Sequence, residues 1–418
     1  MFAERTFDHT PPDSLAMRTI RFVVSCNLLL ACGLSLSFSG CTESVATLEK
    51  APEFTAADVS ADDQLKAKID RVLAQAQRRH LSATENAAWQ ALHEALAFGP
   101  DAMLVDPDGK VVPVIDYLLG GGAMRGWNLR PGDHGLHAVL EQGSKTGMGH
   151  KDQWIGYLAM GGEYYPGRKP ILGSESPIQV GSKTYKLGDL LTQAQWECRE
   201  GMEAGWTLMA LHAYLPLDAQ WQAEDGTTWS IERLLAMESK ADVNAIACGG
   251  THSLSGVTLA VKEYMLQHPE IKPDQLTGGW KAGYEKIRWA IQRAREHQQQ
   301  DGTFSTNYFQ RPGTSADIIL RLGTTGHTLE FLALALNDDE IKAPWMAKAA
   351  EQLCDLLENT QDARVECGAL YHATHGLVAY RMRRFPEKEK TLPAPVPSRS
   401  AEPKADPNGD APPVSGGQ

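Results

Sequence analysis

The segments His252-Ser-Leu-Ser-Gly-Val-Thr-Leu-Ala260 and His327-Thr-Leu-Glu-Phe-Leu-Ala-Leu-Ala335 align residue for residue, and they decide which fold the sequence predicts. Each begins with histidine and carries small or apolar residues on nearly every side of a helix. A helix that is apolar all round is buried in a protein interior. The helices predicted at 281–300 and 343–359 are amphipathic and rich in charge, which is typical of an outer layer. The sequence therefore predicts pairs of an outer and an inner helix.

The same pairing recurs along the chain. Residues 109–119, 181–191 and 226–235 each contain a glycine turn, a short extended stretch and a helix start that ends in Leu-Leu. An inner helix is predicted after each of them, and residues 62–98 supply a further pair. Hairpins that bury one face must stack on neighbours, and a closed ring removes exposed ends. We expect an all-α fold, an α/α toroid of about six helical hairpins with short β-like turns between repeats, over residues 62–385.

The N-terminal residues 1–41 are predicted to be an export signal with a lipobox. Two arginines precede an apolar run at 22–38, and Cys41 follows directly after Ser-Gly. Cys41 resembles the cysteine that is lipidated in bacterial lipoproteins, which implies a lipid anchor in the membrane and a location in the periplasm or cell envelope. Cys32 lies in a rival lipobox, Met17 is an alternative start, and an uncleaved membrane anchor is the alternative interpretation of the apolar run.

The rest of the chain outside the predicted toroid lacks apolar periodicity. Residues 42–61 are predicted to be a linker and residues 386–418 a disordered, proline-rich tail, because such a composition cannot bury enough apolar surface to fold. The chain has 40 basic and 52 acidic side chains, and this formal net charge of −12 argues against a nucleic-acid partner. Seven cysteines in 418 residues are too few for a disulfide scaffold.

One motif connects the predicted toroid to a known superfamily. Gln298-Gln-Gln-Asp-Gly-Thr-Phe304 matches the Gln-x-x-Asp-Gly-x-aromatic motif of terpene cyclases, and Ala223-Glu-Asp-Gly-Thr-Thr-Trp229 is a looser relative. The chain thereby resembles the α/α-toroid superfamily, which includes terpene cyclases, protein prenyltransferase β-subunits and lanthionine-synthetase-like proteins. The motif implies a fold and not a reaction. The chain has neither the Asp-x-Asp-Asp nor the Asp-Asp-x-x-Asp motif, which counts against a terpene cyclase.

Inner helices of such a ring run parallel, so we expect their first turns to meet at one mouth. Six of the 13 histidines fall in these predicted turns together with Trp206: His134, His137, His252, His327, His372 and His375. One histidine on an apolar helix is usually a core residue, whereas several in one register indicate a site. The predicted catalytic centre consists of His252, His327 and His375. The predicted substrate-binding residues are Trp206, His137 and Glu330.

Cysteine placement adds a metal hypothesis. Cys248 lies four residues before His252, so both share a helix face if one helix includes them, and thiolates with imidazoles are ligands that zinc prefers. The predicted metal ligands are Cys248, His252 and His372. Zinc is also what the resemblance to prenyltransferase-like and lanthionine-synthetase-like toroids implies, although Cys248-Gly-Gly departs from the Cys-His-Gly signature of the latter. As an alternative, an exported chain can oxidise its four mature cysteines into one or two disulfides: Cys198, Cys248, Cys354 and Cys367.

Carboxylates near the same turns offer acid–base chemistry instead: Asp133, Glu197, Glu200, Glu203, Glu330 and Glu366. We therefore expect an enzyme, metal-assisted or acid–base, that acts on a glycan or isoprenoid-type substrate. The alternative is a non-catalytic peptide- or glycan-binding or scaffold module of the cell envelope. A deep pocket with converging polar groups would favour the enzyme, and a plugged mouth with each histidine bonded to backbone would favour the module.

Overall fold

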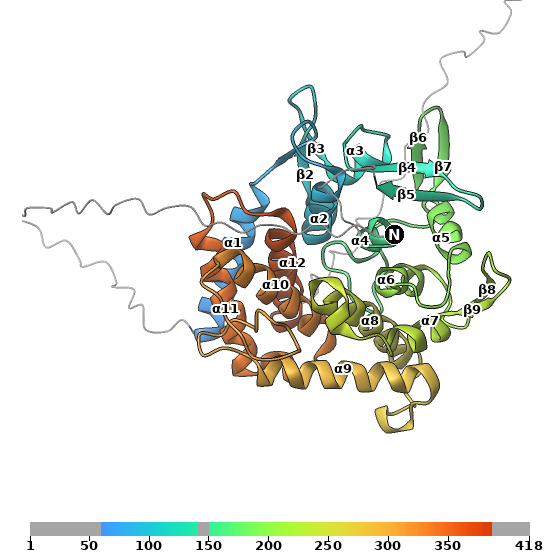
Figure 1. The fold of residues 1–418 in the computed structure, drawn as a ribbon. Coiled ribbons are helices and arrows are strands. Elements are labelled where there is room, and N and C mark those ends of the chain that lie inside the picture. Colours follow the sequence, from blue (N-terminus) through green and yellow to red (C-terminus); the bar gives the residue numbers. More distant parts are fainter. Residues whose placement is uncertain (1–59, 141–149, 387–418) are drawn as a thin grey trace, which may run out of the picture. The chain divides into compact units, whose positions relative to one another are not determined.

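The computed structural model describes residues 60–140 and 150–386, and this part of the chain is mostly helical (Figure 1). The prediction of a helical fold is therefore confirmed. The predicted export signal with Cys41, nearly all of the predicted linker and nearly all of the predicted tail lie outside the described residues. No helix within the described ranges is long and apolar enough to cross a membrane.

Twelve α-helices make up the described chain. They are α1 (Ala61–Gln77), α2 (Ala88–Phe98), α3 (Val114–Leu119), α4 (Gln153–Met160), α5 (Leu187–Trp196), α6 (Gly205–Tyr214), α7 (Ile231–Glu238), α8 (Thr251–Gln267), α9 (Gly278–Glu296), α10 (Ile318–Ala335), α11 (Pro344–Asn359) and α12 (Cys367–Arg384). All residues of α4 and most residues of α6, α8, α10 and α12 are buried. Helices α9 and α11 bury only one face. We call the even-numbered helices the buried helices.

The buried helices contact one another in chain order. Helix α2 packs against α4, α4 against α6, α6 against α8, α8 against α10, and α10 against α12, while α12 packs against α2. The series of contacts thus returns to its first member. Three odd-numbered helices each contact two neighbouring members of this series: α7 contacts α6 and α8, α9 contacts α8 and α10, and α11 contacts α10 and α12.

Short hairpins connect the helices of successive pairs. The strands are β1 (Leu81–Ser82), β2 (Met103–Val105), β3 (Val111–Pro113), β4 (Trp127–Pro131), β5 (Leu136–Leu140), β6 (Pro177–Val180), β7 (Lys183–Lys186), β8 (Gln220–Gln222) and β9 (Thr228–Ser230). Strand β1 is parallel to β2, and the pairs β2–β3, β4–β5, β6–β7 and β8–β9 are antiparallel. Gly181 (φ 59°) and Gly226 (φ 76°) supply the left-handed residue of their turns. The β2–β3, β6–β7 and β8–β9 hairpins are the β-like turns that the sequence predicts between repeats, and α3, α5 and α7 begin directly after them. The β4–β5 hairpin instead lies between α3 and α4.

The β4–β5 hairpin corrects one prediction. His134 lies in its turn and His137 in β5, and neither is in the first turn of a helix. The Gly132 backbone N–H donates to the Gly135 carbonyl (2.9 Å), and this bond closes the turn of an extended ribbon. The buried helix of this pair is α4, which begins further along the chain, at Gln153.

Three predicted first-turn histidines lie deeper in their helices: His327, His372 and His375. Helix α10 begins early because the Asp317 carboxylate accepts hydrogen bonds from the first backbone N–H groups (2.9 and 3.2 Å). Helix α12 begins at its cysteine because Glu366 caps it in the same way. His252 and Trp206 do lie in first turns, those of α8 and α6.

Close packing between buried helices carries the histidines toward one another. A Cβ on Gly326 of α10 would lie 2.5 Å from the Cα of Ala373 in α12. A Cβ on Gly256 of α8 would lie 2.2 Å from a backbone oxygen of α6. Only glycine lets the backbones approach this closely. Because His327 and His372 adjoin the contact between α10 and α12, this approach also brings their imidazoles together.

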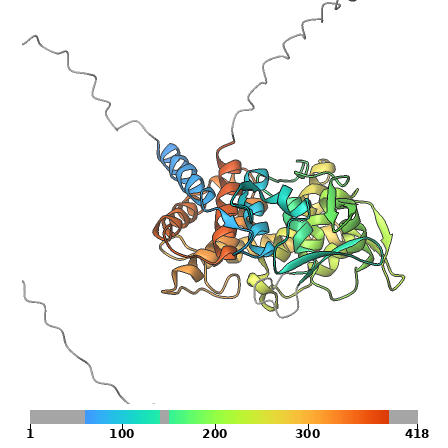
Figure 2. The ribbon, with the colours of Figure 1, turned by 90° about the horizontal axis from the view of Figure 1, so that it is seen from above.

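The first and last described helices lie side by side (Figure 2). Arg384 near the end of α12 donates to both carboxylate oxygens of Asp62 in α1 (2.6 and 2.8 Å). Lys68 of α1 donates to Asp355 of α11 (2.6 Å). These ion pairs join the N-terminal helix to the last helical pair, far away in sequence.

Candidate metal centre

Three buried helices bring one histidine each to a common point in the interior. His252 comes from α8, His327 from α10 and His372 from α12, and one ring nitrogen of each lies within 4.8 Å of the others. The ring centroids are 5.2 Å apart for the first two residues and 4.0 Å apart for the last two. All three side chains are buried. We call these three residues the histidine cluster.

The hydrogen bonds of the histidine cluster leave four ring nitrogens unused. The Nδ1 of His327 donates to the Gly323 carbonyl (2.7 Å), and the Nδ1 of His372 donates to Oε2 of Glu330 (2.8 Å). Within the described chain, the Nε2 atoms of these two residues and both nitrogens of His252 are buried without a hydrogen-bond partner. Buried polar atoms are nearly always paired, since an unpaired one costs about 1–3 kcal/mol. Four such nitrogens at one point indicate a ligand.

Glu330 joins the histidine cluster to a fourth histidine. Its Oε2 accepts from His372, and its Oε1 accepts from the Nδ1 of His375 (2.6 Å), whose Nε2 donates to the Gly162 carbonyl (3.1 Å). Although burial opposes ionisation, His372 and His375 hold the pKa of Glu330 well below its usual range. The carboxylate therefore fixes the orientation of His372.

A second group shares His252 with the histidine cluster. One nitrogen of His150, the Sγ of Cys248 and one nitrogen of His252 lie within 4.8 Å of one another. Cys248 precedes α8 and His150 precedes α4, and both side chains are partly exposed. The Nδ1 of His150 donates to Oε1 of Glu203 at 2.5 Å, which leaves its Nε2 for another partner. The second group is thus closer to solvent than the histidine cluster.

Charge interactions tie Cys248 to two histidines. Burial alone raises the pKa of the thiol, but His327 and His150 outweigh burial and lower this pKa to about 6. Burial likewise opposes protonation of both histidines. Cys248 nevertheless raises both pKa values to about 9, with the help of Glu330 at His327 and of Glu203 at His150. Burial lowers the pKa of His372 to about 4 and that of His252 well below its usual range. Those two are therefore neutral imidazoles, the form that binds a metal.

These residues can hold a metal ion. A ligating histidine usually donates its other ring N–H to a carbonyl or carboxylate, as His327 and His372 do here. A proton on His327 competes with a metal for the Nε2 lone pair, so metal binding would release that proton. Trp206 closes one side, because its ring centroid lies 4.7 Å from that of His252 and 4.7 Å from that of Tyr157.

A cavity of about 360 Å³ reaches the second group at His150. Its lining includes His137, whose Nδ1 lies 3.3 Å from Oε1 of Glu197. Lys151 donates to the other oxygen of the same carboxylate (2.5 Å). His137 therefore lies at this cavity and not within the histidine cluster.

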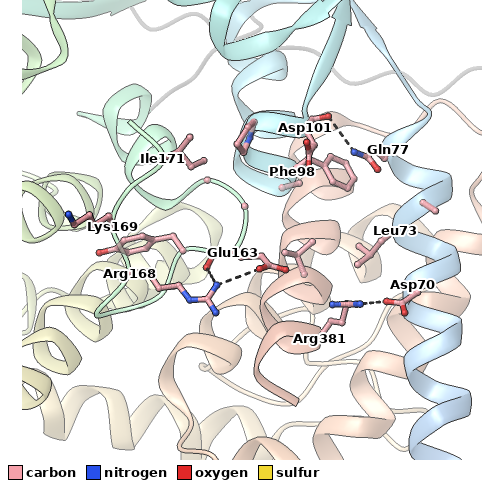
Figure 3. Close-up of a pocket in the computed structure, with 17 residues that line it drawn as sticks. Asp70, Leu73, Gln77, Phe98, Asp101, Glu163, Arg168, Lys169, Ile171 and Arg381 are labelled. Atoms are coloured by element: carbon pink, nitrogen blue, oxygen red, sulfur yellow. Dashed lines mark hydrogen bonds and ion pairs between the residues drawn. The ribbon is translucent and has the colours of Figure 1, made fainter. Parts of the chain in front are cut away.

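A larger cavity, of about 710 Å³, lies between α1, α2, α12 and the segment after α4 (Figure 3). Four of its charged side chains pair with one another: Arg381 with Asp70, and Arg168 with Glu163. Gly162 in its lining is the residue whose carbonyl accepts from His375. The lining contains no member of the histidine cluster, so we do not place the site there.

The structure brings together part of the predicted site. His252 and His327, aligned by the repeat, are neighbours, and His372 joins them. The predicted ligands Cys248, His252 and His372 are divided between two groups that share His252. His375 is one step removed, since Glu330 stands between it and the cluster. Both oxygens of Glu330 are engaged by histidines, so its geometry is that of a positioning group.

The four cysteines form no disulfide within the described ranges. Burial raises the pKa of three of them to about 12: Cys198, Cys354 and Cys367. Cys248 differs from them in its partial exposure and in its histidine neighbours.

One member of the site was not predicted. His150 lies three residues before the start of α4, outside every segment of the repeat that the sequence shows. Its partner Glu203 belongs to the predicted carboxylate set, and proximity to the first turn of α6 was the signal for it. No protein-family model, curated protein or solved structure matches the chain. The resemblance to the α/α-toroid superfamily thus remains a prediction, and the site is argued from its own geometry.

Proposed function

We propose that the helical region is an α/α toroid of six outer–inner pairs. The series of contacts that returns from α12 to α2 supports a closed ring of buried helices. The one-sided burial of α9 and α11 supports their place in an outer layer. The hairpins before α3, α5 and α7 support a repeated unit.

Within this fold we propose a zinc-dependent enzyme whose ion is held by His252, His327 and His372. The observation that carries the proposal is the set of four buried, unpaired ring nitrogens in the histidine cluster. Three neutral imidazoles are a known ligand set of catalytic zinc, which keeps a fourth position for water or substrate. A bound zinc ion would supply Lewis acidity and an activated water. The cavity at His150 supports approach of a substrate from that side.

We further propose that the chain is exported and lipid-anchored through Cys41, with its site in the periplasm or cell envelope. The arginines, apolar run and Ser-Gly-Cys order of the first 41 residues support this location. A glycan or isoprenoid-type substrate fits an envelope enzyme. The intact mass of the protein purified from membranes tests the anchor, because a chain that begins unmodified at Met1 or Met17 contradicts it.

Elemental analysis tests the metal. We expect about one zinc ion per chain in the wild type and none in His252→Ala, His327→Ala or His372→Ala. Glu330→Gln should weaken zinc binding by about 10- to 100-fold, because it loosens the orientation of His372 without removing a ligand.

His212→Leu is the matched control for these variants. His212 is also a buried histidine on a buried helix, but both of its nitrogens are paired, so the variant should keep its zinc. Circular dichroism shows whether each variant is folded. A folded wild type without metal after zinc reconstitution, or folded alanine variants with full zinc content, would overturn the proposal.

A further inference from the structure

The second group has the arrangement of a nucleophile and its base. The Sγ of Cys248 lies within 4.8 Å of a ring nitrogen of His150, and the Nδ1 of His150 donates to Glu203 at 2.5 Å. A thiol, an imidazole and an orienting carboxylate in this order form the working parts of cysteine-based acyl transfer. The three residues come from different segments of the chain, those before α8, α4 and α6.

The backbone presents the Cys248 thiol at the start of a long buried helix. Cys248 has φ 54°, and Gly249 and Gly250 follow with φ 62° and 72°, immediately before α8. A side chain at Gly249 would clash with Tyr308, since a Cβ there would lie 2.2 Å from its ring. A residue with a side chain in this conformation is uncommon and is concentrated at functional sites. The adjacent helix N-terminus favours a thiolate.

The unpaired side chain of His252 also indicates a ligand beside the second group. His252 is 3% exposed, and neither of its nitrogens has a hydrogen-bond partner in the described residues. A neutral imidazole carries one N–H, and it keeps that N–H when its other nitrogen binds a metal. One nitrogen of His252 lies within 4.8 Å of the Cys248 Sγ, and an N–H on that nitrogen can stabilise a negative oxygen.

We propose that Cys248 is the nucleophile of an acyl-transfer reaction, that His150 is its acid–base partner, that Glu203 positions His150, and that the substrates are esters or thioesters. The cavity of about 360 Å³ is lined by His150, and the Cys248 side chain is partly exposed. The second group shares His252 with the proposed zinc site, but the reaction does not require the ion, because thiolate attack needs no metal.

The reaction needs only the ester and water as reagents. The Cys248 thiolate attacks the carbonyl carbon of an ester, and the carbon–oxygen bond of the leaving group breaks. The protonated His150 gives its proton to the departing alkoxide, which leaves as an alcohol. Water then attacks the thioester while His150 removes its proton. The carbon–sulfur bond breaks, so the acid leaves and the thiolate and the protonated His150 return.

Acylation of the full-length chain by p-nitrophenyl acetate tests the proposal. We expect release of p-nitrophenol and a transient mass increase of one acetyl group, which peptide mapping places on Cys248. Cys248→Ala and Cys248→Ser should lose the adduct, and His150→Gln should form it about 10²- to 10⁴-fold more slowly. Glu203→Gln should be slower than the wild type, and Glu203→Asp should recover part of the rate, which a merely structural role would not produce.

Two matched variants control for general damage. Cys354→Ala removes a buried thiol, and His268→Gln removes an exposed histidine whose Nδ1 lies 3.7 Å from Glu270; both should react like the wild type. Zinc content is measured on the same samples, so loss of the metal site and loss of acylation are separated. An acetyl group on another residue, no adduct on the wild type, or an unchanged rate in folded Cys248→Ala would overturn the proposal. So would loss of zinc in Cys248→Ser with no acylation of the wild type, because Cys248 would then be a ligand.

Discussion

Two buried histidines, His93 and His212, share the local structure of His327 in the histidine cluster and differ from it in one hydrogen bond. We call His93 and His212 the paired set. His93 and His212 donate Nδ1 to the carbonyl one turn earlier in their helices, both at 2.7 Å, and His327 does the same. The Nε2 of His93 meets the hydroxyl of Tyr157 (2.7 Å), and that of His212 meets Tyr164 (3.1 Å). The Nε2 of His327 has no such partner in the described residues.

The difference separates core histidines from candidate ligands. A buried imidazole with both nitrogens paired is complete, so His93 and His212 need nothing beyond the protein. In the histidine cluster the Nδ1 atoms of His327 and His372 are hydrogen-bonded, whereas their Nε2 atoms and both nitrogens of His252 have no hydrogen-bond partner in the described residues. Whether a tyrosine hydroxyl pairs with Nε2 therefore indicates the role of each histidine, whereas burial alone does not.

Among the effects expected from this difference, removal of the metal should produce the largest change in the free energy of unfolding. Zinc at 1,000 times its dissociation constant should raise the free energy of unfolding by about 4 kcal/mol, because only the folded chain assembles the ligands. Urea unfolding with zinc and with a chelator measures the difference. His327→Ala should show no difference between the two conditions, whereas a wild type that is equally stable in both would contradict the metal site.

A buried acid next to His93 avoids an unpaired buried charge in another way, by holding a proton. Glu94 follows His93 in α2, is fully buried, and burial raises its pKa from 4.5 to about 8. Because the folded-state pKa is raised, the folded chain holds a proton that the unfolded chain loses above about pH 4.5. Stability should therefore fall by a few kcal/mol as the pH rises toward about 8, and then level off.

Glu94→Gln is the variant that isolates this group. It keeps the shape of the side chain and cannot ionise, so its unfolding free energy should depend less on pH than that of the wild type. Urea unfolding of both proteins between about pH 5 and about pH 8 measures the difference. Parallel pH profiles would mean that Glu94 is charged in the folded chain.

The smallest effect is expected from the paired set itself. His212→Leu should lower the free energy of unfolding by about 1–3 kcal/mol, because the Tyr164 hydroxyl loses its partner. The double variant with Tyr164→Phe should recover part of that loss, since no buried hydroxyl is then left unpaired. Thermal unfolding of the single and double variants measures the coupling, and additive losses would show that the hydrogen bond contributes nothing.

The repeat in the sequence predicted two of the buried helices and two residues of the histidine cluster. Apolar helices that start from aligned histidines identified α8 and α10 as buried helices and brought His252 and His327 to one site. The same reasoning failed at His137, because the interval after a Leu-Leu helix was filled by a β-hairpin before α4 began. Position within a helix was also misjudged, since an Asp317 cap starts α10 well before its histidine.

Residue type and periodicity were enough for burial, helix class and the choice of histidines, because these depend on contacts close in sequence and on a pattern that repeats. The pairing of each nitrogen was not accessible in that way. It depends on whether a tyrosine from another segment reaches Nε2, and on Glu330 of α10 reaching both His372 and His375 of α12. It also depends on His150, which belongs to no repeat, lying beside Cys248. Those contacts join residues far apart in sequence, and hydrogen bonds require placement within a few tenths of an ångström. Only packing of the buried helices, with glycine at their closest approach, sets such distances.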